Sequence, residues 1–289
     1  MPTMPTPSSS APSLPNMSHP HLAALPDTPV VRAALALAHR HLETRVYNHV
    51  VRSAYWMLLL ARKIGAGVEA GGTGTGTGTG TPSSSDDGEL GSMGGDKGRR
   101  FEVEGADVAR GFLGRHGGEG WDERRVQLVW DIIALHTTPF IAQYAAPGVA
   151  LAHLGIMADF MGPMFPKKLL GRFLSGASPS AGADDSEHET GVPGQVITEA
   201  EYREVTSHFP LAGFGREGCK EILCGLCGER PGGTYDNFVG WFGVECGVDG
   251  KGTGKEEYKR KWEEENRKVS EKLLMGLDYL EELVGESQD

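Results

Sequence analysis

The histidine at position 49 is the side chain in this sequence best placed to do chemistry. It lies in the run from Thr44 to Trp56, and apolar residues recur there at the spacing of a helix until glycines 65 and 67 end the pattern. An imidazole can bind a metal ion or transfer a proton near neutral pH. A helical histidine is nevertheless more often structural than catalytic, so a chemical role for His49 requires a partner.

A carboxylate in an apolar helix is the second candidate. Pro147 opens a predicted helix in which Asp159 is an isolated acidic residue among apolar side chains. Burying a lone carboxylate costs several kcal/mol unless it is paired, hydrogen-bonded or bound to a metal. The sequence therefore predicts a specific partner for Asp159. His153, six residues earlier, lies on a different face of the same helix and cannot be that partner.

A second histidine lies where a helix should end. The predicted helix that starts after Asp122 runs to His136 and Thr137, and Pro139 ends it. His136 and Thr137 either orient a substrate and transfer a proton, or His136 is a helix-end residue bonded to a backbone carbonyl. Both interpretations stay open at this point.

The remaining pattern predicts an all-α fold, because no segment alternates polar and apolar residues at a period of two. Residues 1–26 are rich in Pro and Ser and are predicted to form a disordered tail. A helical domain follows over residues 27–245, interrupted by a flexible Gly/Thr/Ser insert at 66–98 and a surface loop at 175–195. An amphipathic helix over 254–286 ends the chain, and its apolar side suggests packing on the core or a homo-oligomer.

Besides Asp122, two helix starts carry capping signals. Thr28 precedes Pro29 at one of them, and at the other Thr198 is followed three residues later by Glu201 as in a capping box. These signals place two helix N-termini to within a residue or two.

Composition excludes several classes of function. The chain has 28 basic and 39 acidic residues, a formal charge of −11, and no Lys/Arg cluster, which disfavours nucleic-acid binding. No apolar run is long enough for a membrane helix, and no signal-peptide pattern is present, so we expect a cytoplasmic protein without a membrane partner. A small neutral substrate suits this charge balance.

The cysteines allow two interpretations. Three of the four cysteines lie at positions 219, 224 and 227, and a Cys-x2-Cys pair is compatible with a zinc or redox site. The same residues follow the apolar period of a helix, which favours small, buried thiols.

Five stretches together resemble the HD-domain superfamily, and within it the cyanamide hydratase-like group of the fungal type. They are RVYNHVVRSAYW (45–56), DKGRRFEVEGAD (96–107), IALHTTP (133–139), HLGIMAD (153–159) and TYDNFV (234–239). The resemblance implies a helical bundle that holds a divalent metal, zinc or iron, between a first histidine, a His-Asp dyad and a final aspartate. His49 matches the first histidine and Asp159 the final aspartate. The implied activity is hydro-lyase chemistry, in which water adds to a nitrile-like carbon and cyanamide becomes urea.

The dyad that the resemblance implies is missing. No histidine in the chain is followed by aspartate, and none occurs between Val50 and Arg115, where the Gly-Thr insert lies. Three explanations stay open: an inactive relative, rescue by substitutes such as His136, Asp86, Asp87 or Asp96, or a gene-model error in this region. The alternatives to a hydratase are a metal-dependent phosphohydrolase and a non-catalytic scaffold.

Overall fold

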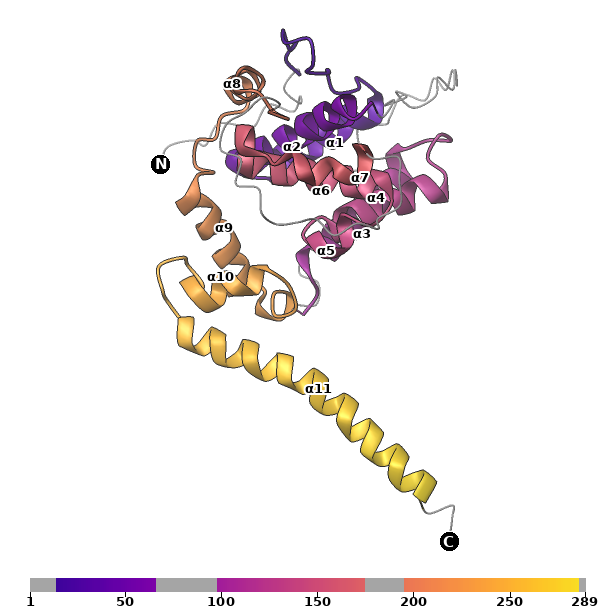
Figure 1. Cartoon of the computed structure of the whole chain (residues 1–289), viewed down its shortest axis with the longest axis vertical. Coiled ribbons are helices and arrows are strands. Elements are labelled where there is room, and N and C mark those ends of the chain that lie inside the picture. Colours follow the sequence, from indigo (N-terminus) through magenta and orange to yellow (C-terminus); the bar gives the residue numbers. More distant parts are fainter. Residues whose placement is uncertain (1–13, 66–97, 175–194, 286–289) are drawn as a thin grey trace, which may run out of the picture. The chain divides into compact units, whose positions relative to one another are not determined.

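The computed structural model describes residues 14–65, 98–174 and 195–285, and the regular elements in these ranges are helices (Figure 1). No strand occurs in these ranges, which confirms the all-α prediction. The chain divides into two compact units. Of the described residues, the first comprises 14–65, 106–174 and 195–214, and the second comprises 98–105 and 215–285.

The first unit contains the helices that carry His49, His136 and Asp159. Its elements are α1 (Pro29–His41), α2 (Thr44–Lys63), most of α3 (Phe101–His116), α4 (Glu123–Leu135), α5 (Pro139–Ala142), α6 (Pro147–Met161), η1 (Gly162–Met164), η2 (Lys167–Leu170), α7 (Gly171–Leu174) and α8 (Glu199–His208).

Local capping chemistry sets three helix starts as predicted. The Thr28 hydroxyl accepts a hydrogen bond from the Val31 amide at 3.3 Å, and the Asp122 carboxylate accepts one from the Arg125 amide at 2.8 Å. At α8, Thr198 and Glu201 form a reciprocal capping box. Each contact satisfies an amide that the helix cannot pair itself, which is why sequence alone locates these starts.

Helices α2 and α6 lie side by side at the centre of the first unit (Figure 1). Trp56, Leu59 and Leu60 of α2 have no exposed surface and form part of its core. Gly155 lets α6 approach closely, because a Cβ at that position would lie 2.7 Å from the Ser53 carbonyl oxygen of α2. The sequence stretches around His49 and Asp159 are thereby brought together.

Part of the predicted N-terminal tail is packed. Leu22 and Leu25 are buried in the core of the first unit, and the amides of Ser18 and His19 both donate to the Glu204 carboxylate. Residues 14–26 of the predicted tail therefore make contacts with the first unit through these leucines and through Glu204. Residues 1–13 lie outside the described ranges.

The second unit has its own small core. It contains α9 (Arg216–Glu229), η3 (Pro231–Gly233), α10 (Val239–Cys246) and α11 (Lys255–Gly285). Cys227, Val239, Val244 and Tyr258 are its buried centre. Residues 215–245 thus group with the C-terminal helix, whereas the sequence places them with the preceding helices.

The cysteines are free thiols, and two are buried as predicted. The Cys227 thiol lies 3.4 Å from the Val239 carbonyl oxygen, to which it donates, and burial raises the pKa of Cys224 to about 11. A protonated thiol that donates to backbone behaves as a small packing group. The redox and zinc alternatives gain no support from this environment.

Several predictions concern residues outside the described ranges. These are almost all of the 66–98 insert with Asp86, Asp87 and Asp96, and almost all of the 175–195 loop. In the part of the chain that is described, no helix is both long enough and apolar enough to cross a membrane.

Candidate functional site

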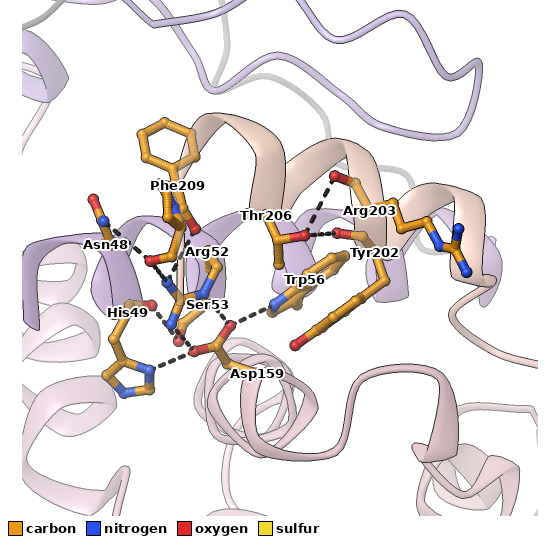
Figure 2. Close-up of polar contacts among 11 residues, drawn as sticks. Asn48, His49, Arg52, Ser53, Trp56, Asp159, Tyr202, Arg203, Thr206 and Phe209 are labelled. Atoms are coloured by element: carbon orange, nitrogen blue, oxygen red, sulfur yellow. Dashed lines mark hydrogen bonds and ion pairs between the residues drawn. The ribbon is translucent and has the colours of Figure 1, made fainter. Parts of the chain in front are cut away.

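Asp159 is a buried carboxylate with four hydrogen-bond donors around it (Figure 2). Its Oδ1 accepts from Arg52 Nε at 2.7 Å and from Trp56 Nε1 at 2.9 Å. Its Oδ2 accepts from Arg52 Nη2 at 2.8 Å and is 2.7 Å from His49 Nδ1. The predicted requirement for a specific partner is confirmed, and α2 supplies all four donors.

Arg52 is fully buried, and its guanidinium makes four hydrogen bonds. Besides its two contacts with Asp159, its Nη1 donates to the carbonyl oxygens of Phe209 at 3.1 Å and Pro210 at 3.0 Å. The guanidinium fork matches the carboxylate in two parallel hydrogen bonds, and its Nη1 group donates to the two backbone carbonyls. Figure 2 shows this cation between the carboxylate and the chain that follows α8.

His49 projects one ring nitrogen toward Asp159 and the other away from it (Figure 2). Its ring stacks on Phe214 with 4.3 Å between centroids, and Phe160 lies 5.2 Å away. The side chain is 17% exposed. An ionised carboxylate can only accept, which places a proton on Nδ1 and leaves the Nε2 lone pair of a neutral ring available as a base or ligand.

The charge state of Asp159 follows from these contacts. Burial by itself would raise the pKa of the Asp159 carboxyl, but the hydrogen bonds from His49 and Arg52, and the Arg52 charge, outweigh burial and lower it below its ordinary 3.8. The carboxylate is therefore ionised throughout the neutral range.

Acid is expected to destabilise the first unit through this group. Because the folded pKa is lower than the unfolded one, the stabilisation is complete above about pH 4 and disappears as the pH falls through the folded value. The 13C shift of the Asp159 carboxyl should titrate below pH 3.8, and the urea midpoint should fall over the same range. An Asp159→Asn variant should lose less stability between pH 5 and 3, and equal acid sensitivity of the two proteins would contradict the assignment.

His136 and Thr137 lie at the C-terminal end of α4, as predicted. His136 Nδ1 is 2.6 Å from the Ile133 carbonyl oxygen, which is the backbone contact of the structural interpretation. The buried His153 of α6 places its Nδ1 2.7 Å from the His136 carbonyl oxygen and so ties this turn to α6. Catalytic roles for His136 and Thr137 stay predictions.

A metal held directly by both His49 and Asp159 does not fit this arrangement. A carboxylate has about four acceptor positions, and Arg52, Trp56 and His49 occupy four at Asp159. In the described ranges, no three His, Cys, Asp or Glu side chains come together as a metal-binding group. Of these two residues, only His49 can still bind a ligand, through Nε2, while Asp159 is hydrogen-bonded to the Nδ1 side of the ring.

Arg52 and Trp56 are the site residues that sequence reasoning failed to assign to Asp159. His49, Arg52 and Trp56 are spaced by three and four residues, so they share one face of α2, and all three carry N–H donors. Three N–H donors on one helix face were the feature of the sequence that could have predicted a carboxylate bound to α2. The contacts of Arg52 with the carbonyls of Phe209 and Pro210 could not be predicted in this way, since every residue has a backbone carbonyl.

No protein-family model, curated protein or solved structure matches this chain. The resemblance to the HD-domain superfamily therefore rests on the five sequence stretches alone.

Proposed function

We propose that this protein is a cyanamide hydratase-like enzyme of the HD-domain type, which adds water to the nitrile-like carbon of a small neutral substrate. The observation that carries the proposal is the His49–Asp159 pair, 2.7 Å apart, with Nε2 on the side of the ring away from the carboxylate. The aromatic rings of Phe160 and Phe214 flank the imidazole. Such a surrounding suits a small, uncharged molecule better than a phosphate ester, because the neighbouring cation, Arg52, is already bonded to Asp159.

His49 and Asp159 have different roles in the proposed hydration. His49 Nε2 takes a proton from water as the water oxygen attacks the carbon, forming a C–O bond while one C–N π bond breaks. The resulting imidazolium returns its proton to the substrate nitrogen. With cyanamide the product is isourea, which tautomerises to urea. Asp159 holds the ring and stabilises the imidazolium, and Arg52 positions Asp159.

Urea formation from cyanamide by the purified full chain, assayed together with metal content, tests the proposal. His49→Gln should lower the rate by about 10²- to 10⁴-fold, the usual contribution of a general base. The exposed His41 offers a matched control, and His41→Gln should keep the full rate. Loss of activity on chelation, with recovery when zinc or iron is returned, would show that the activity also requires a metal ion. An active His49→Gln protein would refute the role of His49.

A non-catalytic scaffold is the second candidate, and the saturation of Asp159 by α2 favours it. The carboxylate is then a structural group that joins α6 to α2. A folded wild-type protein that contains no metal and hydrates no nitrile, with or without added zinc or iron, would support this candidate over the enzyme.

A further inference from the structure

One face of α11 begins as a core element and continues as an exposed apolar stripe. Tyr258 is buried in the core of the second unit, and Trp262 packs against that core. Val269, Leu273, Leu277 and Leu280 continue the same helical spacing, yet each is more than half exposed. Large apolar side chains gathered in this way typically mark an interaction surface.

The charges in the exposed part of α11 are segregated along the helix. Residues 267–272 contain Arg267, Lys268 and Lys272 against one acidic residue, whereas residues 278–282 contain Asp278, Glu281 and Glu282 and no basic residue. Arg267 and Lys268 pair with glutamates of their own helix. Within the described ranges, Lys272 and the three acidic residues have no ion pair. A partner helix of the same sequence, running in the opposite direction, would bring the basic segment against the acidic one.

We propose that the stripe of α11, formed by Val269, Leu273, Leu277 and Leu280, binds the same stripe of a second copy of this chain in an antiparallel pair. A two-fold axis near Gly276 and Leu277 places Leu273 opposite the Leu280 of the other copy at both ends. Gly276 has open space around its Cα, so the two backbones can approach where they cross. A parallel pair would instead place like charges together.

Sedimentation velocity of the full chain over a range of concentrations tests whether the pair forms. The wild type should be a dimer at micromolar concentration, and Leu273→Glu with Leu280→Glu should raise the dissociation constant by at least 100-fold, because four apolar side chains per dimer are replaced by charged ones. Met275→Glu is the matched control: its side chain lies on another face of α11 and is also exposed. A monomeric wild type, or a dimer that survives the double change, would overturn the proposal.

Charge exchange tests the antiparallel direction. Lys268→Glu with Lys272→Glu should weaken the dimer about tenfold at low salt, since attraction between the segments becomes repulsion. Adding Glu281→Lys and Glu282→Lys should return the dissociation constant to within about threefold of the wild type. Circular dichroism confirms that α11 stays helical in each variant. No weakening by the first pair, or no recovery with the second, would rule out the antiparallel arrangement.

Discussion

Asp159→Ala should lower the free energy of unfolding by about 3–5 kcal/mol, the cost of leaving one member of a buried ion pair without the other. The Arg52 guanidinium would keep its two carbonyl acceptors but lose both carboxylate bonds in a position with no exposed surface. The Trp56 indole would also lose its acceptor. Urea unfolding, followed by circular dichroism and tryptophan fluorescence, measures the loss.

Two companion variants separate this ion pair from a general effect of removing charge. Arg52→Met combined with Asp159→Leu should lose less stability than Asp159→Ala, because no buried charge is left unpaired. Glu199→Ala removes a carboxylate of an exposed pair with Arg203 and should cost less than 1 kcal/mol. A cost below about 1 kcal/mol for Asp159→Ala would mean that Arg52 finds water instead, contrary to its burial.

Gly155→Ala should cost about 1–3 kcal/mol, although alanine is the better helix former. The added methyl group would lie 2.7 Å from the Ser53 carbonyl oxygen and 2.9 Å from the Met57 amide nitrogen, and both are backbone atoms that cannot rotate away. Helices α2 and α6 would have to separate, and the hydrogen bonds between them would lengthen. Urea unfolding gives the free energy, and the shift of the Trp56 indole proton reports the contact with Asp159.

Gly114 is the control for this substitution. It lies in α3, is exposed, and has open space around its Cα, so Gly114→Ala should be neutral or stabilising by up to about 1 kcal/mol. If Gly155→Ala behaved like Gly114→Ala, the close approach of α2 and α6 would be wrong.

His49 allows the structural and chemical roles of the site to be told apart. Its replacement by Gln leaves both Arg52 contacts and the Trp56 contact to Asp159 in place. We therefore expect a much smaller loss of stability than for Asp159→Ala, while the proposed hydration would still fail. If the wild-type protein shows no hydratase activity and His49→Gln changes only its stability, the non-catalytic scaffold is the better assignment.

The sequence by itself determined the helices of this protein and one requirement of its site. Thr28, Asp122 and Thr198 locate helix starts through contacts within a few residues, and such local contacts need no knowledge of the fold. The isolation of Asp159 in an apolar helix required a buried partner on energetic grounds alone.

Only the tertiary structure decided which partner that is. The spacing of His49, Arg52 and Trp56 defines a face of α2, but which helix lies against that face depends on the packing at Gly155. The same holds for Leu22 and Leu25, whose burial depends on a surface formed by distant segments. Close packing brings together residues more than a hundred positions apart. The packing energy depends on both surfaces in contact, so neither stretch of sequence determines it alone.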